Sequence, residues 1–570
     1  MGLQHITPLP FKALFPDEEP KELIEYLKGI DKEFLKKTGT FFLGLHHKGS
    51  KWAEPKDFIS QFFSYLNEDF GNEMLNRINA LGKHRYNIPY EISSLKLFEF
   101  VFDNDIPQGD ILSQKEQEVK LFKAYLLLNQ LNTIRANEIT AESIDDVSDD
   151  IKPAAVLIAN HFHNFDLTNY EIDKLFSTQI IKAISLFEFL EREDSASPLL
   201  RKFYRDFGVT GYRDFLRRLI PISASIATKD KESFTDIDVS DNEELAANIE
   251  FLNKLTVQDT SKVEDLDFKG LRAKPLYRVT GSVYRIISPL FALELLFNGL
   301  FWKLKETNDS LSDNEKIKNF NTLKTSKFSE AFILHKVLKR YFGQRYLQLS
   351  GEELDDKYEG APDYYVRNGK RVFLFESKDI LVPAKVKEST DFHVIEKAIA
   401  DKLYKPKGIM QIISNIRKSL TSSQPFDTSA KGKNLIIHPV MVLHQRMFMT
   451  AGMNKMLNFW FQDELKKLQQ EGVDISNVKP LVIIDIDTLI FNQDVFISGR
   501  LNLEDCLVEY QKEYLNFTVA GKKYHSQQDA TDALIDSYLP FSHYLDVKID
   551  KLGLRDIPNE LMEKGYTLFD

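Results

Sequence analysis

A short segment of the chain brings together residue types that can hold a divalent cation and assist hydrolysis. Residues 359–379 read EGAPDYYVRNGKRVFLFESKD, with acidic side chains at Asp363 and Glu376, a lysine at Lys378 and an Asn-Gly dipeptide at 368–369. Two neighbouring carboxylates repel each other, and a bound cation relieves that repulsion. Mg²⁺ takes carboxylate oxygens together with waters and phosphate oxygens. The segment is therefore a candidate site for metal-assisted chemistry on a phosphate.

The Asn-Gly dipeptide predicts how these side chains meet. Between two β-rich runs it is typical of a type I′ hairpin turn, in which both central residues have positive φ. With residues 368–369 as the loop, Asp363 faces Leu374. Alternate residues of a strand share a face, so Glu376 and Lys378 lie on that same face. Glu376 is then the diagonal neighbour of Asp363, with Cβ atoms roughly 7–8 Å apart or less.

This arrangement predicts a division of labour. A metal ion between the carboxylates would lower the pKa of a bound water and neutralise charge on the phosphate under attack. Lys378 would orient that water, help to deprotonate it, or stabilise the developing negative charge. The simpler interpretation is an edge hairpin with solvated charges. The apolar run at residues 372–375 argues against it, because such a run predicts a buried strand.

The order of Pro-Asp, a turn and Glu-x-Lys resembles the PD-(D/E)XK nuclease superfamily. That family's core is a helix, a hairpin that carries the motif, a second helix and another strand, and residues 327–443 offer the same order. The resemblance extends at most to residue 489. The family often adds a glutamate on the first helix and a glutamine on the following helix, which Glu330 and Gln411 match.

The resemblance implies a role for each matched residue. Mg²⁺ is the expected cofactor, with Mn²⁺ as the alternative ion. The implied metal ligands are Asp363, Glu376, the carbonyl of Ser377 and, directly or through water, Glu330. Lys378 would attend the attacking water, and Gln411 would position a neighbouring group. The implied catalytic residues are Asp363, Glu376, Lys378 and Gln411.

A basic cluster supports a phosphate-bearing substrate. Residues 402–418 contain no acid, and their basic residues are Lys402, Lys405, Lys407, Arg417 and Lys418. Basic side chains that contact phosphates supply most of the non-specific affinity for nucleic acid. A solvated helix face is the alternative explanation. We expect a nucleic-acid substrate, with double-stranded DNA cut internally as the favoured case.

The chain that must position these residues is expected to be an α/β protein. We expect residues 321–570 to form a restriction-endonuclease-like core, a mixed sheet flanked by helices, after a polar, turn-rich segment at 305–327. We expect residues 1–150 to form a helical N-terminal region. We expect residues 151–320 to form a mostly helical recognition or regulatory region. By analogy, a large companion region suits a restriction or antiphage-defence nuclease. An unregulated nuclease would be toxic, so we expect a trigger, a homo-oligomeric gate or a regulatory partner.

Two other functions stay open. The nuclease fold could be inactive and serve to bind nucleic acid or protein. Alternatively, Asp485 and Asp487 in PLVIIDIDTLI resemble the first motif of haloacid-dehalogenase-like phosphatases, as nucleophile and acid/base; few residues follow that could carry the family's other motifs. The segment ANHFHNFD also holds His161, His163 and Asp166, and its two histidines could share Zn²⁺ or Mn²⁺ with a third ligand left unspecified, although packing or loop histidines are the more ordinary explanation.

Composition indicates the compartment. The single cysteine, Cys506, excludes an internal disulfide and a cysteine-rich zinc site and fits a reducing compartment, which we take to be the cytoplasm. The N-terminus lacks the apolar core of a signal peptide. The most apolar stretch, residues 283–302, is broken by Arg285, Pro289 and Glu294, so we expect a buried helix and no membrane association. The net charge of −11 means that contacts to nucleic acid must come from a local basic patch.

Overall fold

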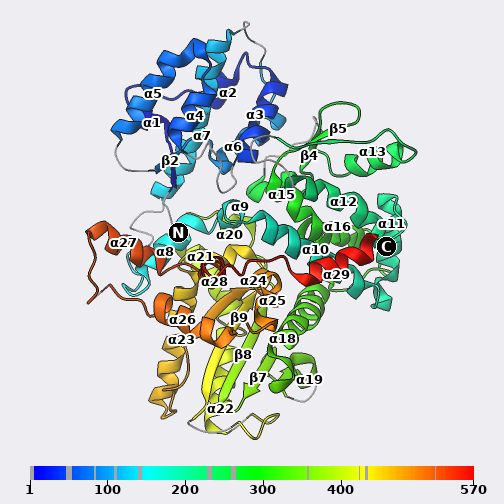
Figure 1. Cartoon of the computed structure of the whole chain (residues 1–570), viewed down its shortest axis with the longest axis vertical. Coiled ribbons are helices and arrows are strands. Elements are labelled where there is room, and N and C mark those ends of the chain that lie inside the picture. Colours follow the sequence, from blue (N-terminus) through cyan, green and yellow to red (C-terminus); the bar gives the residue numbers. More distant parts are fainter. Residues whose placement is uncertain are drawn as a thin grey trace.

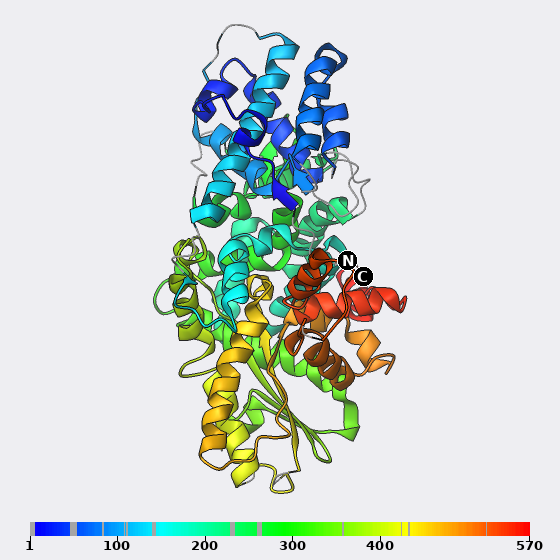
Figure 2. The same ribbon diagram turned by 90° about the vertical axis from the view of Figure 1, so that its left-hand side faces the viewer.

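The computed structural model of the chain is elongated, with helices at one end and a sheet at the other (Figure 1). The described residues are 6–45, 54–81, 85–107, 109, 112–138, 144–227, 234–258, 265–355, 358–422, 424–430, 434–519 and 521–569. The blue N-terminal helices form one end, and the green and yellow strands lie toward the other (Figure 2). Helices from the middle of the chain lie between them, beside the orange and red C-terminal helices.

A five-stranded mixed sheet lies in the C-terminal half, in the order β10-β9-β8-β7-β6. Strands β6 (Leu347–Ser350), β7 (Tyr364–Asn368) and β8 (Arg371–Lys378) form an antiparallel meander. Strands β9 (Ile436–Leu443) and β10 (Val482–Asp485) run parallel to β8. The α/β architecture expected from the sequence is confirmed. Since β8 is the central strand and its apolar run is buried, the hairpin does not lie at an edge.

Helices connect and flank these strands. A π-helix, η6 (Leu323–Leu334), continues into α18 (His335–Phe342) and precedes the meander. Helices α21 (Phe392–Leu403) and α22 (Ile409–Thr421) lie between β8 and β9 in the chain, and α23 (Met453–Gln470) lies between β9 and β10. The elements therefore follow in the expected order of helix, hairpin, helix and strand, with β6 added before the hairpin.

The hairpin register differs from the prediction by two residues. Asn368 pairs with Arg371, so residues 369–370 form the loop, and Leu374 lies opposite Tyr365 instead of Asp363. Glycine occupies the first central position with φ of +59°, and the second central residue does not have a positive φ. That pattern fits a type II′ turn better than a type I′ turn. Because the shift is an even number of residues, every side chain keeps the face predicted for it.

Separate apolar cores cover the two faces of the sheet. Val372 and Leu374 face a core shared with the helices that follow β8 and with α8 (Lys152–His161). Phe373 and Phe375 face the opposite core, which includes α10 (Ile172–Leu190) and the C-terminal helices. Helices from residues 151–320 therefore pack directly against the sheet. The N-terminal helices have their own core within residues 9–128.

The middle of the chain is not wholly helical. Residues 283–302, expected to form one buried helix, begin instead as strand β5 (Val283–Ile286) and become helical at α15 (Pro289–Glu294). Strand β5 pairs with β3 (Asp236–Asp238) and β4 (Leu276–Arg278) in a small antiparallel sheet. Among the described helices, none combines the length and the apolar character needed to cross a bilayer.

A partly buried ion cluster joins the middle of the chain to the segments that follow β8 and β9. Arg272 lies 3.0 Å from Asp166 and 2.7 Å from Glu294, and Arg446 lies 2.9 Å from Glu294. Lys387, at the end of α20 (Ala384–Lys387), lies 2.8 Å from Asp166. Asp166 is thus engaged by cationic side chains from both parts of the chain.

A strained turn belongs to the same cluster. Asp267 and Phe268 have φ of +64° and +53°, a left-handed conformation that costs of order 1–3 kcal/mol for each non-glycine residue. The Asp267 carboxylate accepts a hydrogen bond from Lys387 at 2.6 Å, and its backbone N–H donates to Glu388 at 2.7 Å. Both partners come from the segment that follows β8. The turn is therefore held by contacts to the C-terminal half.

The only cysteine of the chain provides a probe of this fold. Cys506 lies on α26 (Leu503–Tyr510), is 1% exposed, and burial raises the pKa of its thiol to about 11. We predict that the native protein does not react with a thiol reagent at pH 8 and that the denaturant-unfolded chain reacts with one equivalent. Absorbance of the released chromophore measures both. Complete labelling of the native protein within minutes would contradict the packing of α26.

Candidate active site

The start of β7 and the end of β8 bring Asp363, Glu376 and Lys378 together. The Lys378 ammonium lies 2.5 Å from Glu376 Oε1 and 3.8 Å from Asp363 Oδ2. Ser377 contributes its backbone on both sides: its N–H donates to Asp363 Oδ2 at 2.6 Å, and its carbonyl accepts from Lys378 at 3.0 Å. The structure therefore places four of the predicted groups on one patch of the sheet.

Glu330 reaches this patch from the π-helix η6. A Cβ atom at Gly351 would lie 3.3 Å from Glu330 Oε1 and 3.1 Å from the carbonyl oxygen of Asp363, so only glycine gives both groups this much room. The Gly351 N–H donates to the same Asp363 carbonyl at 2.8 Å. The charge of Glu330 contributes to the raised pKa values of Glu376 and Lys378. Sequence reasoning gave no signal for Gly351.

Burial makes the electrostatics of the patch unusual. Glu376 is 1% exposed, and burial first, then the charge of Asp363, raises the pKa of its carboxyl group well above the ordinary value. Burial favours the neutral amine of Lys378, yet the carboxylates of Glu376 and Asp363 raise its pKa. One ammonium thus faces the carboxylates of Glu330, Asp363 and Glu376. This leaves the patch with an excess of negative charge.

Hydrogen bonds fix the backbone that leads into Asp363. His335 lies 2.9 Å from the Asp363 carbonyl oxygen, and burial lowers its pKa to about 4, so a neutral ring donates through Nε2. Gln411 donates to the carbonyl of Ala361 at 2.9 Å, and Asn415, one helical turn later, donates to the carbonyl of Gly360 at 3.0 Å. The group that Gln411 positions is therefore the backbone before the Pro-Asp dipeptide. Sequence reasoning missed His335 and Asn415.

The predicted basic cluster is divided between exposed and paired side chains. Lys402, Lys405 and Lys407 are exposed at the end of α21 and the turn into α22. Arg417 forms an ion pair with Glu471, which reduces the charge that it can offer to a phosphate. Lys418 donates to the backbone carbonyl of Glu359 at 3.3 Å, on the segment that leads to the patch.

The two acids of the alternative phosphatase motif have structural partners. Strand β10 ends at Asp485, whose side chain caps α24 (Ile486–Phe491) by accepting hydrogen bonds from Thr488 N at 2.8 Å and Thr488 Oγ1 at 2.5 Å. Asp487 forms a buried ion pair of 2.6 Å with Lys182. The strand predicted over PLVIIDIDTLI is thus shorter than expected, and both acids are engaged inside the protein.

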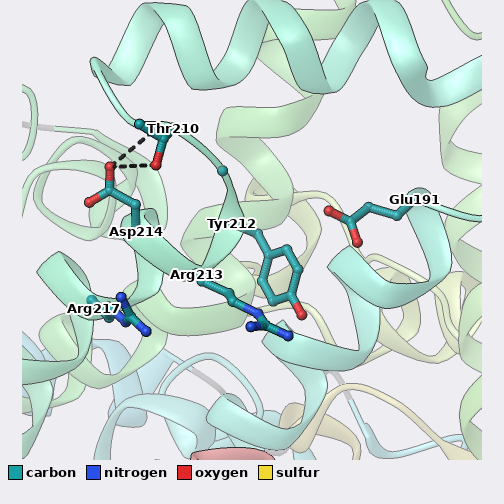
Figure 3. Close-up of a pocket in the computed structure, with 7 residues that line it drawn as sticks. Glu191, Thr210, Tyr212, Arg213, Asp214 and Arg217 are labelled. Atoms are coloured by element: carbon teal, nitrogen blue, oxygen red, sulfur yellow. Dashed lines mark hydrogen bonds between the residues drawn. The ribbon is translucent and has the colours of Figure 1, made fainter. Parts of the chain in front are cut away.

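A shallow hollow of about 540 Å³ lies elsewhere, at the start of α12 (Tyr212–Ala227), as Figure 3 shows. Arg213 and Arg217 line it together with Glu191. The Asp214 side chain accepts a hydrogen bond from Thr210 N at 2.9 Å. The hollow contains none of the predicted site residues.

The groups that contact the Lys378 ammonium present oxygen atoms, and such hard ligands suit Mg²⁺ or Mn²⁺. They are the carboxylates of Asp363 and Glu376 and the carbonyl of Ser377. Within the described part of the chain, no three acidic, histidine or cysteine side chains form a ready metal cage. Mg²⁺ does not require one, because it usually binds through one or two carboxylates and completes its shell with water and phosphate oxygens. The donor set therefore fits the ion that the sequence implied.

Comparisons with protein-family models, with curated proteins and with solved structures gave no match for this chain.

The crowding of carboxylates predicts the stability of one variant. The free energy of unfolding of Glu376→Gln should equal or exceed that of the wild type, because the substitution removes one charge from a buried, negatively charged patch. A raised pKa means that the native state holds the proton more tightly than the unfolded chain, so the wild type loses stability as pH rises through the native pKa. The advantage of the variant should therefore grow with pH. Urea unfolding at pH 6 and pH 9 measures it.

A carboxylate at the other end of β8 serves as the control. Glu504 pairs with Arg371 at 3.1 Å, and Glu504→Gln should not gain stability with pH. If Glu376→Gln were less stable than the wild type at both pH values, the patch would not be crowded with negative charge as described.

Proposed function

We propose that the chain is a metal-dependent nuclease of the PD-(D/E)XK type that hydrolyses phosphodiester bonds, with double-stranded DNA cut internally as its substrate. One observation carries the proposal: Asp363 and Glu376 both lie within 3.8 Å of the Lys378 ammonium, at the ends of two paired strands. The order of elements around them, a helix, an antiparallel meander, two helices and a parallel strand, matches what the resemblance implies.

The chain's own groups would hold the metal ion and the substrate. Asp363, Glu376 and the Ser377 carbonyl would bind the ion, with Glu330 beside them. When bound, the ion would supply positive charge at the scissile phosphate and acidify a water molecule. Lys378 lies against carboxylates and is therefore protonated, so stabilising charge on the phosphate fits it better than removing a proton.

The middle and N-terminal parts of the chain would supply recognition and control. Helices from residues 151–320 pack against both faces of the sheet, and Lys182 from this region pairs with Asp487 just after β10. We propose that this region senses the trigger, or a partner or second copy of the chain, in a restriction or antiphage-defence nuclease acting in the cytoplasm. A chain that binds DNA without cutting it under any metal condition would instead be the inactive binding module.

Cleavage tests the assignment directly. Purified protein with Mg²⁺ or Mn²⁺ should cut plasmid DNA, and chelation should stop the reaction. Glu376→Gln and Lys378→Met should each lower the initial rate at least about 100-fold, the loss typical when a group that stabilises transition-state charge is removed. Conversion of supercoiled to nicked and linear DNA on a gel gives the rates.

Glu504→Gln is the matched control for cleavage, because it removes a carboxylate at the opposite end of β8. It should cut at the wild-type rate. Equal cutting by the wild type, Glu376→Gln and Lys378→Met would show that any activity lies elsewhere or in a contaminant.

The exposed lysines make a separate prediction about binding. Replacing Lys402, Lys405 and Lys407 together by alanine should weaken DNA binding and lower the slope of log Kd against log salt by about 2 to 3, since each phosphate contact contributes about 0.9. Arg417→Ala should change the slope by less, because Glu471 already pairs with that side chain. Fluorescence anisotropy across a salt series, with Ca²⁺ in place of Mg²⁺, measures the slope. An unchanged slope in the triple variant would place the DNA on another surface.

A further inference from the structure

A second buried carboxylate lies directly beside the proposed site. Asp379 follows Lys378 in the chain, and its side chain is 1% exposed. Its Oδ2 atom lies 2.6 Å from the Lys324 ammonium and accepts a hydrogen bond from Ser329 Oγ at 2.6 Å. Gln445 donates to its other oxygen at 3.3 Å. Asp379 is not one of the residues that the motif implies.

The cationic partner of Asp379 and its hydroxyl partner both come from η6, the π-helix that carries Glu330. Lys324 and Ser329 are five residues apart, and both contact the same carboxylate oxygen. In an α-helix, residues five apart point about 140° away from each other around the axis. The i→i+5 hydrogen bonds of a π-helix bring such residues close to one side. The unusual helix geometry is therefore what lets one carboxylate hold both side chains.

The contact ties together two backbone segments that each carry part of the site. Ser329 is the neighbour of Glu330 on the helix, and Asp379 is the neighbour of Lys378 at the end of β8. A 2.6 Å hydrogen bond between Ser329 and Asp379 therefore limits how far the Glu330 backbone can move from the strand. The pair of Lys324 and Asp379 acts on the same two segments.

Stability alone does not account for such a pair. Removing two charges from water is costly, and apolar residues of similar volume often stabilise a protein as well or better. What a buried ion pair with an added hydroxyl does provide is one fixed geometry. A fixed geometry matters most where carboxylates from separate elements must converge on one cation.

We propose that Asp379, together with Lys324 and Ser329, is a positioning group that sets the place of Glu330 relative to Glu376 and Lys378. The inference rests on the proposed function, because it assigns these residues to the same metal site. It predicts that loss of the contact weakens metal binding without removing any ligand. Changes to residues around a metal site typically cost 10–100-fold in metal affinity or activity.

The direct test measures Mn²⁺ affinity by electron paramagnetic resonance of the free ion. The double variant Lys324→Met/Asp379→Asn removes the ion pair without leaving an unpaired buried charge. Its Kd for Mn²⁺ should rise about tenfold or more, as should the Mn²⁺ concentration for half-maximal cleavage, while KM for DNA at saturating metal stays unchanged. Ser329→Ala should show the same direction, and Ser329→Thr, which restores the hydroxyl, should recover the wild-type affinity.

An equally buried pair provides the control. Lys182 and Asp487 lie 2.6 Å apart just after the end of β10, on a different strand end from Glu376 and Lys378. The double variant Lys182→Met/Asp487→Asn should keep the wild-type Mn²⁺ affinity, whatever its melting temperature. Should both double variants shift the affinity equally, the effect would be general destabilisation and the positioning role would be wrong.

The outcomes separate this inference from the proposed function. If the wild type binds Mn²⁺, Asp363→Ala abolishes that binding, and the Lys324/Asp379 and Ser329→Ala variants all bind as the wild type does, the positioning role falls and the nuclease assignment stands. A wild type that binds no Mn²⁺ and cuts no DNA overturns both. Should the double variant fail to fold, the contrast between Ser329→Ala and Ser329→Thr decides the question alone.

Discussion

The burial of Glu376 is the constraint on which the rest of the C-terminal half depends. A carboxylate that is 1% exposed cannot stay ionised without a partner close by, and Lys378, two residues later on the same face of β8, supplies it. The same ammonium also lies 3.8 Å from the carboxylate of Asp363, which directly precedes the neighbouring strand β7. A central strand, with helices covering both of its faces, is what removes water from this patch. An edge strand would leave the same three side chains solvated and nearly independent of one another.

The sequence predicted the convergence of these side chains better than the hairpin that produces it. Strand periodicity depends only on whether a residue number is odd or even, so an error of two residues in the register left Asp363, Glu376 and Lys378 on one face. The turn itself was wrong because an Asn-Gly dipeptide can place its glycine at either central position. Contacts such as that of His335 with Asp363 could not be predicted, since they join elements that only the folded chain brings together. Nothing in the periodicity of η6 distinguishes a π-helix from an α-helix.

The acidic residues at the carboxyl ends of the parallel strands β8 and β10 are buried, and most of them pair with lysines from earlier in the chain. Asp379 after β8, and Asp485 and Asp487 at the end of β10, are all buried. Two of the three lie against lysines from earlier in the chain, Lys324 for the first and Lys182 for the last. The charges needed to neutralise the end of the sheet thus come from residues outside the sheet's own segment. A fragment that begins after η6 would lose these cations, and its strand ends would carry unpaired buried acids.

The left-handed turn at Asp267 and Phe268 gives the two halves of the chain a reciprocal energetic link. Its conformation is unfavourable for non-glycine residues and is stabilised by Lys387 and Glu388, which follow the central strand. Any movement that withdraws those two side chains would allow the turn to relax to ordinary dihedral angles. Thermodynamic linkage is reciprocal. Relaxation of the turn would therefore weaken its hydrogen bonds to Lys387 and Glu388, at the end of α20, by the same amount of free energy. A conformational change in one half of the chain therefore shifts the conformational equilibrium of the other half. The link to the site is short, because fewer than ten residues separate Lys378 from Lys387.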